Sequence, residues 1–169
     1  MKTYDLDAVE YIAKLADGGL RDSLSLLDKC LSYSNELTVE NIVKALGVAD
    51  YKTMIDLTDS FINKDAGYII KIIEQVHNEG KDLKQFIRQY INFILDIKKY
   101  LILGKFDYLN LPQTDDIQLM LKNIMADVDR GSFNIISDLL DLLIRINSEI
   151  KYDSSPKYMI EAMLLEGMK

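Results

Sequence analysis

The longest apolar helical pattern in this chain lies in residues 82–103, which read DLKQFIRQYINFILDIKKYLIL. Apolar side chains recur there at helical spacing, at Leu83, Phe86, Ile87, Tyr90, Ile91, Ile94, Ile97 and Leu101. Such spacing puts them on one face of a helix. Asp82, with Gln85 three positions later, is a helix-start signal, and Gly104 is a stop signal. We therefore predict one long helix with a buried stripe.

The same period recurs along the whole chain, and no segment shows the apolar/polar alternation of strands. A second apolar stripe is formed by Ile135, Ile136, Leu139, Leu140, Leu143, Ile146 and Ile150. The expected helices, besides the one above, cover residues 5–16, 19–33, 39–46, 51–63, 65–79, 115–130, 132–151 and 156–166. N-caps are expected at Thr38, Asp65, Thr114, Ser132 and Ser155, and helix ends at Gly47, Gly80 and Gly131. The predicted fold class is all-α, a very small bundle followed by a larger one.

The three helices of the first fifty residues are expected to pack through one apolar face each. These faces are Val9, Ile12 and Ala13 in the first helix, Leu20, Leu24, Leu27 and Leu31 in the second, and Val39, Ile42, Val43 and Leu46 in the third. Cys30, the single cysteine, lies among the leucines and is interpreted as a buried apolar residue.

Charge and composition exclude several classes of protein. Twenty basic against twenty-seven acidic residues give a net charge of −7, and the basic residues are scattered, which disfavours direct DNA binding. One cysteine permits no disulfide framework, as is typical of the cytoplasm. The chain has neither a signal-peptide pattern nor an apolar run long enough to span a membrane. We expect a cytoplasmic protein without a membrane partner.

Arg21 is the one candidate site residue, because a cation in a first helical turn opposes the helix dipole at a cost of about 0.3–1 kcal/mol. Gly18 and Gly19 precede it, so a phosphate could approach both the backbone N–H groups and the guanidinium. Alternatively, Arg21 is a surface residue paired with Asp17 or Asp22. No nucleophile–base pair, metal-ligand cluster or phosphate-binding loop is found, so no catalytic or metal residue is predicted.

Residues 12–28, which read IAKLADGGLRDSLSLLD, resemble the gamma/tau subunits of bacterial DNA polymerase III, the ATPases of the sliding-clamp loader. The shared pattern is Gly-x-x-Arg-Asp-x-x-Ser-x-x-Asp. Likeness to that family is also found in residues 37–47, 80–86 and 154–165, whereas residues 50–79 and 104–153 match only in helical pattern and length. The resemblance implies an AAA+ lid over residues 1–48, followed by a collar domain for oligomerisation over residues 49–169.

In that family the arginine at the position of Arg21 senses the γ-phosphate of the nucleotide, with Gly18, Gly19 and Asp22 in support. The resemblance implies a lid-and-collar piece of a longer parent, which binds ATP and Mg²⁺ and loads the sliding clamp onto primed DNA within a replicative polymerase holoenzyme. The phosphate-binding loop, the magnesium-binding acidic strand and the arginine finger of the family lie upstream of the matching part. We expect no cofactor and no ATPase activity in this piece alone.

The partners that the resemblance implies are the other subunits of a hetero-pentameric clamp loader, with self-association also possible. The sliding clamp and DNA would be reached through the parent's ATPase domain. Two alternatives stay open: the lid and collar of another AAA+ protein, such as a related clamp-loader subunit, and a stand-alone helical adaptor that binds other proteins.

Overall fold

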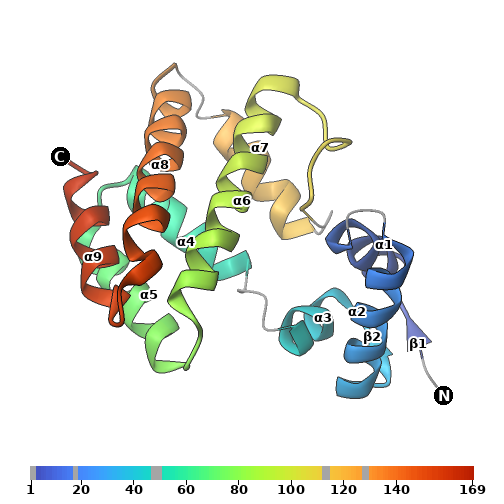
Figure 1. Ribbon diagram of the computed structural model, residues 1–169. Helices are drawn as coiled ribbons and strands as arrows, with labels where there is room; N and C mark the ends of the chain where they lie inside the picture. Colours follow the sequence, from blue (N-terminus) through green and yellow to red (C-terminus); the bar gives the residue numbers. More distant parts are fainter. Residues whose placement is uncertain (1–2, 17–18, 47–50, 112–114, 127–129) are drawn as a thin grey trace.

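The computed structural model describes residues 3–16, 19–46, 51–111, 115–126 and 130–169 (Figure 1). Helices dominate these ranges, which confirms the predicted all-α class. The elements are β1 (Thr3–Tyr4), α1 (Leu6–Leu15), α2 (Leu20–Tyr33), β2 (Glu36–Leu37), α3 (Val39–Leu46), α4 (Tyr51–Ile62), α5 (Ala66–Asn78), α6 (Leu83–Leu103), α7 (Asp115–Ala126), α8 (Arg130–Glu149), the 3-10 helix η1 (Ile150–Tyr152) and α9 (Pro156–Glu166).

The first three helices enclose a small hydrophobic core, the N-terminal core, which consists of Ala8, Tyr11, Ile12, Cys30, Leu37 and Ile42. Cys30 is 1% exposed, so the prediction that it is a buried apolar residue is confirmed. The two short strands pair in parallel, with Thr3 opposite Glu36 and Tyr4 opposite Leu37. This pairing, which the sequence analysis did not predict, joins the start of α1 to the segment between α2 and α3.

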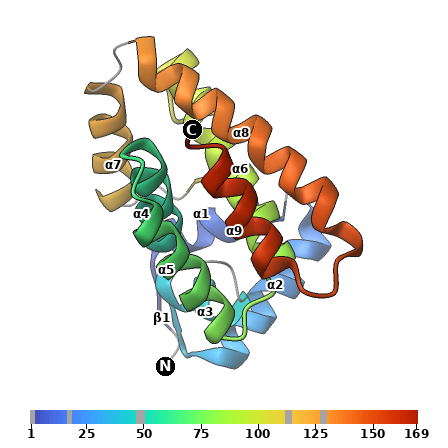
Figure 2. The same ribbon diagram turned by 90° about the vertical axis from the view of Figure 1, so that its left-hand side faces the viewer.

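The remaining helices form a larger bundle around a second core, the C-terminal core. The long helices α6 and α8 lie side by side at its centre, and α9 packs against both α5 and α8 (Figure 2). Every member of the two predicted apolar stripes is buried in this core or packed against it. The core residues come from α4 to α9, including η1, and from the segment after α6, where Leu109 and Leu111 are buried.

Local capping explains where several helices begin and end. The side chain of Asp82 accepts hydrogen bonds from the backbone N–H groups of Lys84 and Gln85, and Asp65 accepts one from Tyr68. Gly80 and Gly104 end α5 and α6 with positive φ angles of 72° and 63°. These four expected signals are therefore confirmed.

Two details of the prediction are wrong. Helix α8 begins at Arg130, so residue 131 does not end a helix and residue 132 does not cap one. Leu20, Leu24 and Val9 are 76%, 57% and 45% exposed, and Ala13 is exposed as well, although all four were expected in a core. Leu27 and Leu31, on the same face of α2, do pack against the N-terminal core, so the contact of this face with the core is confined to the C-terminal half of the helix. The expected signals at Gly47 and Thr114 lie outside the described residues.

Tyr51, the first residue of α4, packs against both cores. Among the described residues, no other side chain packs against both cores. None of the helices in these ranges is long and apolar enough to cross a bilayer.

Candidate functional site

The candidate site lies where α1 ends and α2 begins. The N–H of Ala16 donates to the carbonyl of Ile12 at 3.0 Å, and the N–H of Gly19 donates to the carbonyl of Ala16 at 2.8 Å. Gly19 then serves as N-cap of α2 in an extended conformation. The carbonyl of Ala16, at the end of α1, therefore lies beside Gly19, at the start of α2. Gly18, which the sequence analysis grouped with Gly19, lies outside the described residues.

Gly19 leaves almost no room for a side chain. A Cβ atom built on it would lie 3.0 Å from Oδ2 of Asp22 and 3.1 Å from the carbonyl oxygen of Ala16. Its φ of −77° is accessible to any residue, so a close approach of neighbouring atoms, rather than backbone strain, favours glycine here. The absence of a side chain also leaves the first turn of α2 without a side-chain cap.

Arg21 is the second residue of α2 and is exposed. Within the described part of the chain its side chain forms no ion pair or hydrogen bond, with Asp22 or with any other residue. The alternative of a surface pair with Asp22 therefore has no support, and Asp17 lies outside the described residues. The guanidinium stands free beside the positive end of the helix dipole, where an anion would be stabilised by both.

Asp22 and Ser23 stabilise the start of the helix. An acid in the first turn interacts favourably with the helix dipole, as Asp22 does here. Ser23 donates from both its backbone N–H and its hydroxyl to the carbonyl of Gly19, each at 2.9 Å. The dipole interaction of Asp22 and the two hydrogen bonds of Ser23 thereby stabilise the first turn, which carries Arg21.

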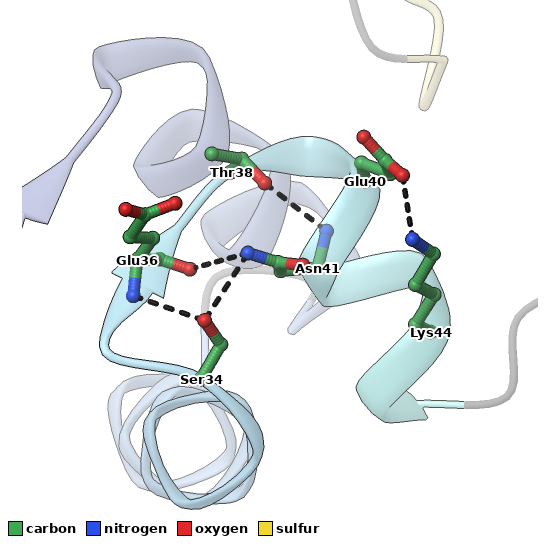
Figure 3. A network of polar contacts seen from close by, with 6 residues as sticks. All are labelled: Ser34, Glu36, Thr38, Glu40, Asn41 and Lys44. Carbon is green, nitrogen blue, oxygen red and sulfur yellow. Dashed lines mark hydrogen bonds and ion pairs between the residues drawn. The ribbon is translucent and has the colours of Figure 1, made fainter.

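A polar network, shown in Figure 3, orders the other end of α2. The side-chain amide of Asn41 donates to Oγ of Ser34 at 3.2 Å and to the carbonyl of Glu36 at 2.9 Å. The backbone N–H of Asn41 donates to Oγ1 of Thr38 at 3.1 Å, which confirms Thr38 as the N-cap of α3. The network therefore joins the end of α2, β2 and the start of α3.

The sequence analysis missed Asn41, because its partners lie in a turn and a strand rather than at helical spacing. It also missed the contact between Tyr11 and Tyr51, whose hydroxyl oxygens are 2.6 Å apart. The two residues are separated by 40 positions, and no local pattern relates them.

The groups of the described turn that carry charge or lie nearby differ in what they are suited to do chemically. Burial raises the pKa of the Cys30 thiol above its usual value, which disfavours the reactive thiolate. In the described ranges, no group of three or more His, Cys, Asp or Glu side chains is placed to hold a metal ion. The described residues of the turn are thus chemically suited to a phosphate-like anion.

Comparison with known families divides the chain into two matches. The model for the DNA polymerase III clamp loader subunit, ATPase lid domain, matches residues 2–36. The model for DNA polymerase III subunits gamma and tau, domain III, matches residues 37–168. Together the two matches cover nearly every residue.

Individual relatives agree with this division. The chain is 24% identical to the DNA polymerase III subunit tau of Bacillus subtilis (strain 168) over 164 residues, which are 94% of this chain and 28% of that protein. It is 26% identical to the DNA polymerase III subunit gamma of Buchnera aphidicola subsp. Acyrthosiphon pisum over 97 residues, 54% of this chain and 27% of that protein. A plant protein, STICHEL-like 2 of Arabidopsis thaliana, is 30% identical over 94 residues, 56% of this chain and 11% of that protein. The chain thus matches just over a quarter of the length of the two bacterial relatives.

Proposed function

Because the chain belongs to the gamma and tau family of DNA polymerase III subunits, we propose that it acts as the nucleotide-sensing lid and the ring-forming collar of a clamp-loader ATPase. The parent subunit would load the sliding clamp onto primed DNA in an ATP-dependent way. The lid would be residues 1–48 and the collar residues 49–169. This boundary is supported by the two separate cores, since the buried members of the first end at Ile42 and those of the second begin at Met54.

The observation that carries the proposal is the free guanidinium of Arg21 beside the uncapped first turn of α2. These groups fit a phosphate, because a guanidinium can donate two parallel hydrogen bonds to phosphate oxygens and the helix dipole favours the negative charge. ATP bound between the lid and the parent's ATPase domain would supply a γ-phosphate, whose charge is lost from that place after hydrolysis.

Each neighbour of Arg21 has a separate role in this proposal. Arg21 donates to the phosphate oxygens and thereby holds the lid in one position while ATP is bound. Gly18 and Gly19 leave the approach to the backbone N–H groups free of side chains. Asp22 stabilises the first turn through the dipole and does not itself contact phosphate, since two negative groups repel each other.

The Mg²⁺ that accompanies ATP would be held by the ATPase domain of the parent, as would the arginine finger and the phosphate-binding loop. The described residues of this chain contain no cluster suited to a metal ion. We therefore propose that this piece senses nucleotide but does not hydrolyse it alone. Its place of action would be the cytoplasm, together with the rest of the replication machinery.

The collar would hold the subunit in a pentameric ring with other clamp-loader subunits. Support comes from large apolar side chains that the bundle leaves exposed, including Ile102, Leu103, Leu119 and Ile144. Such side chains suit contacts with another subunit. The sliding clamp and DNA would be contacted by the ATPase domain, in keeping with the net charge of −7 of this chain.

The role of Arg21 is tested by Arg21→Ala in the full-length subunit, assembled into the clamp loader. We expect the apparent Kd for ATP to rise about 10- to 100-fold, as for loss of a charge-assisted bidentate contact, while the ring still assembles. The matched control is Lys29→Ala, which removes a cation from the same helix, two turns away. Unchanged ATP-dependent clamp loading by Arg21→Ala would refute the sensing role and leave the collar role standing.

The collar role is tested on the 169-residue chain itself, by light scattering over a concentration series and calorimetric titration with ATP. Self-association, or co-assembly with other clamp-loader subunits, without ATP binding is the expected result. Tight ATP binding by this chain alone would overturn the view that the nucleotide site needs an upstream domain. Failure to associate with itself or with any loader subunit would refute the collar role.

A further inference from the structure

Two hydroxyl groups meet where the three N-terminal helices contact the helical bundle. Tyr11, in the middle of α1, is a member of the N-terminal core and is 1% exposed. Its hydroxyl oxygen lies 2.6 Å from that of Tyr51, the first residue of α4. Either hydroxyl can donate to the other, so each satisfies its partner in a place that is largely closed to water.

The rings of the same residues continue the contact into the bundle. The Tyr11 and Tyr51 rings meet edge to face, with centroids 6.1 Å apart, and Tyr51 lies 6.0 Å from the ring of Phe93 in α6. Phe93 stacks with Tyr90 at 6.3 Å, and Tyr90 with Phe86 at 6.1 Å. A row of five aromatic rings therefore runs from α1 into the centre of the C-terminal core.

The position of this row links it to Arg21. Tyr11 lies in α1, and α1 leads directly into the turn that carries Gly19 and the start of α2. The strand pair and the Asn41 network hold the three N-terminal helices together. A displacement of α1 from Tyr51 would therefore carry the Arg21 turn with it, whereas an intact contact keeps that turn in one orientation relative to α6.

We propose that Tyr11 and Tyr51 form a clasp that holds the N-terminal helices on the collar bundle, and that opening this hydroxyl pair is the step that frees the Arg21 turn to change its orientation. One hydrogen bond and one edge-to-face ring pair together are strong enough to favour one orientation of the N-terminal helices on the bundle. They are also weak enough that a ligand which binds the released orientation more tightly than the held one can reverse this preference. The clasp is a property of this chain and does not depend on which ligand Arg21 binds.

The test measures the distance between the N-terminal helices and the collar bundle in the 169-residue chain. With Cys30→Ala as background, spin labels at Ser32→Cys in α2 and Arg88→Cys in α6 report the separation of exposed positions on the two parts. The unaltered pair of tyrosines should give one narrow distance distribution. We expect Tyr51→Phe, which leaves the Tyr11 hydroxyl without its partner, to raise the equilibrium constant for release about five- to tenfold and to broaden the distribution. Tyr51→Ala should broaden it further.

The matched control is Tyr90→Phe, because Tyr90 forms a hydroxyl pair of the same kind with Thr58, at 3.0 Å, entirely inside the bundle. It should reduce stability but leave the distance distribution narrow. Circular dichroism is used to check that each variant is folded. Tyr11→Phe is measured as well, so that the test does not depend on the folding of Tyr51→Ala. The clasp is refuted if Tyr51→Phe and Tyr11→Phe leave the distribution unchanged, or if Tyr90→Phe broadens it to the same extent.

Discussion

The carboxylate of Asp96 accepts a hydrogen bond from the backbone N–H of Asn110, 14 positions later in the chain, at 2.8 Å. Its other oxygen binds Nζ of Lys99 at 2.9 Å. Asp96 is only 2% exposed, so its carboxylate is largely shielded from bulk water. The bond to Asn110 fastens the segment after α6 back onto that helix, where Leu109 and Leu111 enter the C-terminal core, whereas the bond to Lys99 lies within α6.

Replacing Asp96 should therefore destabilise the collar bundle. Asp96→Ala leaves the N–H of Asn110 without its acceptor and removes the partner of Lys99, and we expect the free energy of unfolding to fall by about 2–4 kcal/mol. Urea denaturation measures the change. Asp107→Ala, at an exposed position of the same segment, should change stability by less than about 0.5 kcal/mol. Equal effects of the two substitutions would show that the Asp96 bonds contribute nothing.

Lys64 occupies a backbone position that usually belongs to glycine. Its φ is 57°, and the N–H groups of Lys64 and Asp65 donate to the carbonyls of Phe61 and Ser60, as in a helix-ending turn. Lys64→Gly removes the steric cost of this conformation, and we expect it to raise the free energy of unfolding by about 0.5–1 kcal/mol. The same change at Lys71, on the exposed side of α5, should lower it by about 1 kcal/mol. Destabilisation by both substitutions in urea melts would contradict the argument.

Two glycine-to-alanine substitutions should have opposite effects. Gly19→Ala brings a methyl group within 3.1 Å of the Ala16 carbonyl, which cannot move without disturbing the turn, so we expect a loss of about 1 kcal/mol. Gly67→Ala in α5 meets no atom closer than 3.6 Å and should gain up to about 0.5 kcal/mol from helix propensity. Thermal unfolding of the two variants side by side tests the difference. A stabilising Gly19→Ala would show that the turn has room for a side chain.

Stability should fall at alkaline pH because of three buried tyrosines. Burial raises the pKa of Tyr11, Tyr51 and Tyr90 above the usual value of 10.0, and for Tyr51 repulsion from Tyr11 and Asp96 adds to the effect. Above about pH 10 the unfolded chain releases these protons while the folded chain keeps them. The unfolded state then binds fewer protons, so the free energy of unfolding decreases as pH rises.

The contribution of these tyrosines is therefore complete below about pH 10 and is lost above it, by up to about 1.4 kcal/mol per pH unit for each tyrosine. Urea melts at pH 8, 10 and 11, with tyrosinate absorbance at 295 nm, measure the decline. Tyr51→Phe should make the slope above pH 10 smaller by roughly one third, since it removes one of the three groups. An unchanged slope in that variant would mean that Tyr51 titrates normally in the folded protein.

Local rules predicted most of the helices well. The period of apolar residues and the caps at Asp65 and Asp82 depend on neighbours within four positions, so they can be read without knowing what lies across the fold. The same rules failed at residues 130–132, where a glycine and a serine imitate a helix end and a cap but lie inside α8. A strongly apolar helix tolerates a glycine in its first turns when packing over its remaining length compensates.

The candidate site was predicted in part. A cation in a first helical turn singled out Arg21, the family pattern implied its role, and the structure adds that its guanidinium is exposed and unpaired within the described residues. Its role in sensing nucleotide stays a prediction. The contacts that orient the turn, Tyr11 with Tyr51 and Asn41 with Ser34, could not be inferred, because their partners follow no helical spacing.

Residue spacing and capping alone thus specified the helical class, the boundaries of most helices and the first-turn position of Arg21, because these depend on interactions between near neighbours. The folded arrangement specified which side of α2 is buried, the parallel pairing of β1 with β2, the Asp96–Asn110 bond and the Tyr11–Tyr51 contact. Each of these depends on which distant segment packs nearby, and apolar periodicity shows that a face will be covered without showing what covers it.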